Sequence, residues 1–408
     1  MNPRVTALAL ATFFVVVQFY TSLAPLAPTP PVGYVFTNRA TAAALVGLLV
    51  AAGLACGLVL VRDRALLGRS PSHAILALWL LAATLSSALG LAPAFGFAVT
   101  AMMALAALFH LALVRTFGQP GVARTVLGAY LAAGVAATVA GVVMAVLRRP
   151  ALLSAFNHGR AAGVFVTANQ FAAFAIAFGF VALGVALAAR GSLRRLAVAS
   201  CLAAGAALVA TVSVAGLLGA VAGGIFYSLA LGVRRVAALL AVALVIAAAV
   251  LALRPAAAHD PAEEFDRLRT WQAGLRVATL FPLTGVGPMA YWRVYPTIRP
   301  PSGDPPGTFG ALHPHDAYLS LAADTGLVGL AALGLGWLRF GRTIRRNLPA
   351  RTARERRFVL GVCAALVAVL VQGVFDTIGI VAMTYVWIPY MALALAAAEK
   401  GLPSLERA

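Results

Sequence analysis

Charged residues are scarce in this sequence of 408 residues. They make up 11% of the chain, against about 25% in an average soluble domain, whereas 62% of the residues are hydrophobic. A soluble protein of this size could not bury that many apolar side chains, because roughly a quarter of its unfolded surface stays in water. The composition therefore excludes an ordinary soluble enzyme, a disordered chain and a nucleic-acid-binding domain. It predicts a protein that folds in a lipid bilayer.

Cysteine is also rare. The three cysteines (Cys56, Cys201 and Cys363) all fall inside apolar runs, and none has a partner at a suitable spacing. The sequence therefore predicts thiols that pack in the core, and neither a disulfide framework nor a cysteine metal site.

Long apolar runs make up most of the sequence. A membrane-crossing helix needs about 20 predominantly apolar residues, and about twelve such runs are present, which predicts an all-α polytopic integral membrane protein. The runs are 5–23, 40–61, 72–91, 94–114, 122–146, 164–189, 195–212, 214–232, 236–253, 316–338, 357–374 and 379–398. The first run could also be read as a signal peptide, but we expect an uncleaved first helix, since the later spans need a fixed start.

Basic residues give the expected orientation. All of them are arginines except Lys400, and with the N-terminus in the cytoplasm 21 fall on the cytoplasmic side and 10 on the other. The positive-inside rule then predicts that both termini are cytoplasmic. We divide the chain into nine predicted spans in residues 1–253, an outer loop over 254–315, and three spans with a cytoplasmic tail in 316–408.

The outer loop is the one long predicted connection, and loops of this length are usually functional. Counting Asp316 at its edge, it holds half of the 12 acidic residues, and it holds three of the six histidines. An ion-coupled transporter would usually show several ionisable groups within its spans and two similar halves. The sequence shows neither feature.

The loop begins with a helix signal. Asp260-Pro261-Ala262-Glu263-Glu264 combines a capping acid, a proline and further acids, and predicts a helix to about Leu280. Arg267 and Trp271 would share one face, whereas Arg269, Gln272 and Arg276 would share another. These arginines could also pair with lipid phosphates or with nearby acids. Next, Pro282-Leu283-Thr284-Gly285-Val286-Gly287-Pro288 predicts a turn that its glycines make tight, or simply a joint between two short helices.

Histidines close the loop in Leu312-His313-Pro314-His315-Asp316. A histidine at a helix start near the outer surface is suited to proton transfer at neutral pH, although it could equally be a capping or interfacial residue. His313 and His315 cannot share one helical face, so a zinc site would need a third ligand nearby.

A second outer site is Asn157-His158-Gly159-Arg160, at the outer end of the sixth predicted span. Asn169 lies about two turns into that span. It could serve the site or simply form a hydrogen bond between helices.

Taken in chain order, these elements resemble the O-antigen ligase and O-antigen polymerase superfamily. The matching elements are Arg160 with Gly163-x-Phe165 and Asn169, then Arg267-x-x-x-Trp271 with Pro282-Leu283-x-Gly285-Val286-Gly287, then His315-Asp316-x-Tyr318-Leu319 with Asp324-x-Gly326-Leu327-Val328-Gly329. Three departures stand out. The family usually has His-Asn at His315-Asp316 and Glu at Asp324, and it often has Ser-Arg at Ser213-Val214. If that arginine binds the donor phosphate in the family, another arginine must do so here, and Arg160, Arg269 and Arg276 are the candidates.

The resemblance implies a membrane glycosyltransferase of the bacterial inner membrane with a periplasmic site. It would move a glycan from undecaprenyl diphosphate to a hydroxyl, on lipid A–core in the ligase branch or on a second lipid-linked glycan in the polymerase branch. We expect His315 as general base, Arg160 and Arg267 as the main diphosphate ligands, and Arg269 or Arg276 assisting them. Supporting roles fall to Asp316, His313, Trp271, Asn169 and Tyr318. Arginine binds phosphate with a planar, permanently charged donor set, so we expect no metal and no cofactor. The sequence leaves two further functions open, namely a ligase that glycosylates proteins and a glycolipid flippase or transporter.

Overall fold

We describe the protein from a computed structural model. It describes residues 3–19, 39–62, 71–149, 151, 154, 157–165, 167–238, 261–298, 313–376 and 380–402. Across these residues the secondary structure is helical and there are no strands. The all-α prediction is therefore confirmed.

The helices follow the predicted apolar runs closely. They are α1 (Pro3–Phe19), α2 (Arg39–Arg62), α3 (Pro71–Leu89), α4 (Pro93–Thr116), α5 (Val122–Leu147), α7 (Ala168–Ala188), α8 (Gly191–Thr211), α9 (Val214–Ala230), α11 (Pro261–Leu280), α12 (Tyr291–Ile298), α13 (Ala317–Asn347), a 3-10 turn (Leu348–Ala350), α14 (Ala353–Gln372) and α15 (Ile380–Lys400). In the described ranges, α4, α5, α7, α8 and Ala317–Ala350 are long and apolar enough to cross a membrane. The predicted span 236–253 lies almost wholly outside the described residues.

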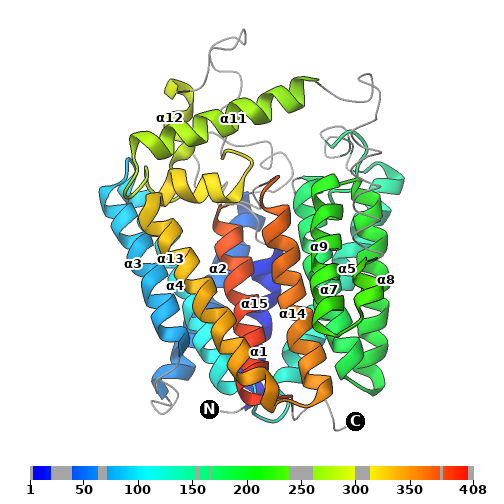
Figure 1. Cartoon of the computed structure of the whole chain (residues 1–408). Coiled ribbons are helices and arrows are strands. Elements are labelled where there is room, and N and C mark those ends of the chain that lie inside the picture. Colours follow the sequence, from blue (N-terminus) through cyan, green and yellow to red (C-terminus); the bar gives the residue numbers. More distant parts are fainter. Residues whose placement is uncertain are drawn as a thin grey trace.

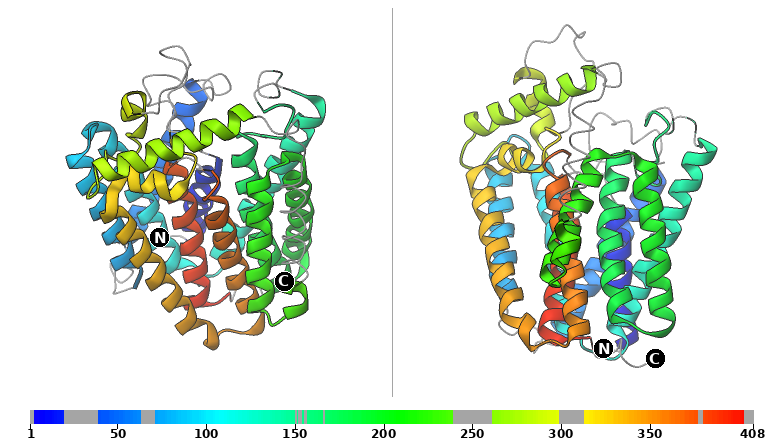
Figure 2. Two further views of the ribbon diagram at one scale, coloured as in Figure 1. Left: turned by 45° about the horizontal axis from the view of Figure 1, so that its top comes forward. Right: turned by 45° about the vertical axis from the view of Figure 1, so that its right-hand side comes forward.

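The long helices run side by side as a bundle, and α11 lies across one end of it (Figures 1 and 2). The start of α1 and the end of α15 lie at the opposite end (Figure 1). A buried aromatic group joins α1, α5, α7 and α15, where Tyr130 and Tyr390 share a hydrogen bond of 2.6 Å between their hydroxyls and Phe14 stacks on Tyr130. The helix α7 meets α14 at Gly184 and Gly361, whose missing side chains let the two backbones touch.

Two features differ from the predicted helices. The run 316–338 was expected as a single span, but α13 continues to Asn347 and has non-helical backbone angles at Gly326, with φ 61° and ψ −161°. Its first segment lies along the end of the bundle beneath α11, and the rest descends along the side of the bundle (Figures 1 and 2). The second feature is α12, a short helix that follows the predicted turn at 282–288. That turn is thus a joint between α11 and α12.

Candidate functional site

His315 lies at the end of the bundle covered by α11, one residue before the cap of α13. Its backbone adopts the left-handed region with φ 55°, which is uncommon for a residue with a side chain and is frequent at functional sites. Asp316 is the N-cap of α13, because its Oδ1 accepts the backbone N–H groups of Tyr318 and Leu319, each at 2.8 Å. The carboxylate of Asp316 is therefore engaged with the helix start, and burial raises its pKa.

The helix α11 holds the segment that carries His315. Thr270 Oγ1 donates to the carbonyl of Pro314 at 3.2 Å, and Trp271 Nε1 donates to the carbonyl of His315 at 3.5 Å. A Cβ atom on Gly274 would lie 2.8 Å from the Pro314 ring, so a glycine is needed there for close packing. Trp271, predicted as a supporting residue, therefore contacts the backbone of His315.

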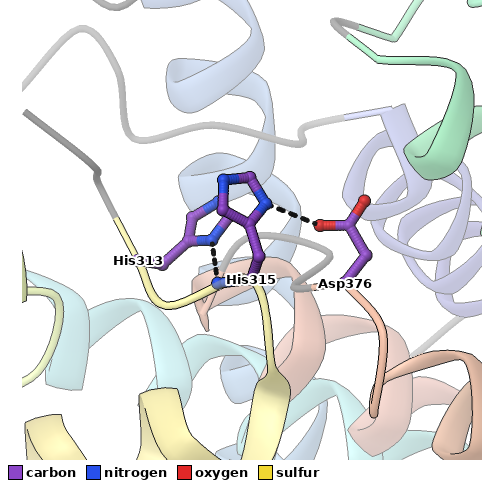
Figure 3. Close-up of side chains that lie close together, drawn as sticks. All are labelled: His313, His315 and Asp376. Carbon is purple, nitrogen blue, oxygen red and sulfur yellow. Dashed lines mark hydrogen bonds and ion pairs between the residues drawn. The ribbon is translucent and has the colours of Figure 1, made fainter. Parts of the chain in front are cut away.

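A buried carboxylate faces the ring of His315. Asp376 lies in the connection after α14, and its Oδ1 is 3.4 Å from His315 Nδ1. The side chain of His315 is 43% exposed, whereas that of Asp376 is only 9% exposed. His313 adds its ring 4.6 Å from that of His315, and its Nδ1 accepts the backbone N–H of His315 at 3.3 Å. Figure 3 shows His315 and Asp376 pointing toward each other with the His313 ring alongside. We call His313, His315 and Asp376 the histidine cluster.

Two members of the histidine cluster have displaced pKa values. Burial acts to raise the pKa of Asp376, but the hydrogen bond and the charge of His315, the charge of His313 and a hydrogen bond from Asn169 together hold it below its ordinary value. Burial, and then repulsion from His315, lower the pKa of His313 to about 3. At neutral pH the cluster therefore contains an ionised carboxylate and a neutral His313.

Asn169 extends this cluster to Arg160. The Oδ1 atom of Asn169 accepts hydrogen bonds from Arg160 Nη2 at 3.0 Å and from Ser213 Oγ at 2.8 Å, while its side chain also hydrogen-bonds Asp376. Arg160 Nε donates to the carbonyl of Thr211 at 2.9 Å. The residues His315, Asp376, Asn169 and Arg160, from three separate parts of the chain, thus form one continuous hydrogen-bonded series, which we call the polar relay.

The other predicted site residues lie as follows. Tyr318 donates its hydroxyl to the carbonyl of Leu370 at 2.9 Å, which ties α13 to α14. On α11, Arg269 is partly buried and Arg276 is exposed, whereas the side chain of Arg267 lies outside the described residues. These positions bring His315, His313, Asn169 and Arg160 together and give Asp316, Tyr318 and Trp271 mainly backbone partners.

Two members of this region were not predicted as site residues. The sequence contains one indication that Asp376 belongs to the site, because it is among the few acids beside a predicted outer span end. Ser213 was considered only as a departure from the family pattern, yet it caps α9 and binds Asn169.

The glycine motifs form a second structure beside the site. Residues 284–287 pack against residues 323–326, and we call this contact the glycine joint. Val286 N–H donates to the carbonyl of Ala323 and Gly287 N–H to that of Asp324, each at 2.9 Å. Cβ atoms added to Gly285 and Gly326 would overlap backbone carbons of the facing segment. The fully buried Asp324 accepts the backbone N–H of Met289 at 2.9 Å, just before α12. The motif is therefore a packing device.

Comparison with known families agrees with these motifs. Residues 198–334 match the family described as O-Antigen ligase. The match covers Ser213, the glycine joint and His315, and it confirms the predicted resemblance to the O-antigen ligase superfamily. No curated protein matches the chain.

Proposed function

From the match of residues 198–334 to the O-antigen ligase family, we propose that this chain is an inverting glycosyltransferase. It would transfer a glycan en bloc from undecaprenyl diphosphate to a hydroxyl of lipid A–core oligosaccharide. The family supports a membrane enzyme with a lipid-linked glycan donor and an acceptor. The acceptor, the mechanism and the residues are our proposal, and the polar relay is the observation that carries it.

His315 is the general base in this proposal. Its Nδ1 faces the ionised carboxylate of Asp376, so a proton on Nδ1 leaves Nε2 with a lone pair. A carboxylate that fixes the tautomer of an imidazole in this way is the arrangement of a general-base pair. Nε2 would take the proton of the acceptor hydroxyl as its oxygen attacks the anomeric carbon. Direct attack on that carbon inverts its configuration. Asp376 acts through His315, so we assign it as a positioning residue.

Arg160 is the donor ligand best supported by the geometry. The departing lipid diphosphate carries several negative charges, and fixed cations can stabilise them as they develop. The Arg160 guanidinium is held by Thr211 and Asn169 at the turn before Ser213. That turn is where the family often places Ser-Arg, so Arg160 would replace the charge that Val214 lacks. Arg267 on α11 would be the second diphosphate ligand, with Arg269 or Arg276 assisting.

We propose that arginine provides the electrostatic stabilisation without a metal. Arginine is permanently charged and binds phosphate through paired donors. Magnesium sites instead use clustered oxygen ligands, whereas the acids described near the relay have other partners: Asp316 caps α13, and Asp324 binds the backbone before α12.

Purified protein in detergent tests the enzyme proposal directly. With undecaprenyl-diphosphate glycan and both acceptors present, a ligase forms glycosylated lipid A–core, a polymerase forms a longer lipid-linked glycan, and a protein ligase requires a polypeptide acceptor. A flippase forms no glycosylated product in this assay, because it only moves a lipid across a sealed membrane. Product only on the second lipid-linked glycan would replace the ligase assignment with the polymerase. No product on any acceptor would reject the enzyme.

In cells, loss of a ligase should leave bare lipid A–core and accumulate lipid-linked glycan. Loss of a polymerase should instead leave lipid A–core carrying a single repeat unit. Deletion of the gene followed by analysis of the lipopolysaccharide therefore separates the two branches independently of the reconstituted assay.

A further inference from the structure

The histidine cluster has the composition of a transition-metal site. One ligand atom from each of His313, His315 and Asp376 lies within 4.8 Å of the other two. Two imidazoles and one carboxylate form a set that suits zinc, which is commonly four-coordinate. The side chain of His315 is 43% exposed, so the cluster is accessible from solvent. A zinc site at the two histidines needs a third ligand, and Asp376 provides it from a distant part of the chain.

The backbone holds these ligands close to the required spacing. Ligand atoms around tetrahedral zinc lie about 3.3 Å apart, given bonds of about 2.0–2.2 Å. His315 Nδ1 and Asp376 Oδ1 are already 3.4 Å apart. The left-handed backbone of His315 sets its ring across that of His313. His313 would give up the hydrogen bond that it accepts from the His315 backbone, whose length of 3.3 Å is at the long end of the range.

The outer contacts of the cluster also suit a metal ion. Two imidazoles and a carboxylate are ligands that zinc binds well. Asn169 holds Asp376 through a hydrogen bond. Metal ligands are commonly oriented by such outer hydrogen bonds.

We propose that the histidine cluster binds one Zn²⁺ ion, and that this ion inhibits the enzyme. The inhibition rests on the proposed function, because zinc would occupy the Nδ1 atom of His315 and the carboxylate of Asp376 together. The ion would separate the general base from the carboxylate that sets its tautomer. Zinc here is an inhibitor and takes no part in glycan transfer.

Isothermal titration of the full-length protein, stripped of metal and held in detergent, tests the site without reference to activity. We expect one Zn²⁺ per chain, no competition from excess Mg²⁺, and an affinity at least about tenfold weaker in Asp376→Asn and His313→Ala. The control His158→Ala alters an exposed histidine that also has a positive φ, and it should bind as the wild type does. Co²⁺ bound to the wild type should show the absorption of a tetrahedral site.

The binding proposal is overturned if the wild type takes up no stoichiometric zinc, or if Asp376→Asn binds it with unchanged affinity. The near-isosteric Asp376→Asn variant keeps the test valid should His313→Ala fail to fold. The inhibition proposal is overturned if saturating zinc leaves the transfer rate unchanged. If His315→Ala retains transfer, the proposed function fails, whereas the measured zinc affinity still decides the metal site.

Discussion

The polar relay and the glycine joint lie at the same end of the bundle, but the relay is formed by side chains and the joint by backbone. The relay consists of ionisable and amide side chains that contact one another through single hydrogen bonds. The joint consists of backbone contacts that glycines permit. We propose that the relay serves the chemistry, whereas the joint holds α13 at its bend near Gly326. Substitutions should therefore separate activity from stability.

The largest expected effect is on His315. His315→Ala should lose at least about 10²–10⁴-fold in transfer rate, the usual contribution of a general base, while still folding and inserting into the membrane. Initial rates on purified protein measure this effect, with His158→Ala as the matched control. Near-normal transfer by His315→Ala would eliminate it as the base.

Arg160→Ala should reduce the turnover rate by about 10²–10³-fold, which is typical of losing one donor to a developing negative charge. The exposed Arg293→Ala is the control, since its guanidinium stacks over Trp292 on α12. A small change that appeared only in the Michaelis constant for the acceptor would contradict the assignment of Arg160 to the donor diphosphate.

Asp376→Asn should slow transfer by about 10–100-fold, less than the loss of His315, because the base of the reaction remains and only its orientation is disturbed. Because the pKa of Asp376 is held low, the wild-type carboxylate stays ionised above about pH 5.5. The deficit of the variant should therefore be similar from about pH 5.5 to 8. A pH–rate profile measures this, and a deficit that vanished at either end of the range would argue against the role.

The glycine joint should respond in stability. Gly285→Ala forces a side chain onto a backbone with φ 65° and against the carbonyl carbon of Asp324, so we expect a loss of about 1–3 kcal/mol. Thermal unfolding in detergent measures it, alongside transfer activity per folded molecule, which should be retained. Gly334→Ala is the control, because nothing lies within 4 Å of its added Cβ in α13. Equal melting of both variants would refute the packing role.

The smallest expected effect is that of a chelator. EDTA should not slow transfer, and removal of contaminating zinc should leave the rate unchanged or raise it. If EDTA abolished activity and Mg²⁺ or Mn²⁺ restored it, the arginine-based stabilisation of the diphosphate would be wrong.

Much of the fold could be predicted from the sequence, because a bilayer-spanning helix requires a continuous apolar run. Helix boundaries in α4, α5 and α8 agree with the predicted spans to within a few residues. The bend in α13 could not be predicted in this way. Gly326 lies in an otherwise helical run, and its left-handed backbone depends on the residues 282–284 that pack against it.

The candidate site was predictable only in part. His315 and Arg160 were identified by residue type and order along the chain. Asp376 follows His315 by 61 residues, and nothing in its neighbouring sequence marks it as a partner. Asp316, which adjoins His315, was the natural candidate for orienting it, yet its carboxylate caps α13.

The sequence by itself predicted apolar helices long enough to cross a membrane, the helical class and the resemblance to the O-antigen ligase superfamily, because apolar length and local motifs are properties of neighbouring residues. Only the tertiary structure decided which carboxylate faces His315 and which arginine reaches the turn before Ser213. Those pairings depend on how α7, α13 and α14 pack together. Hydrogen bonds span only about 3 Å, so they report positions in space that order along the chain does not specify.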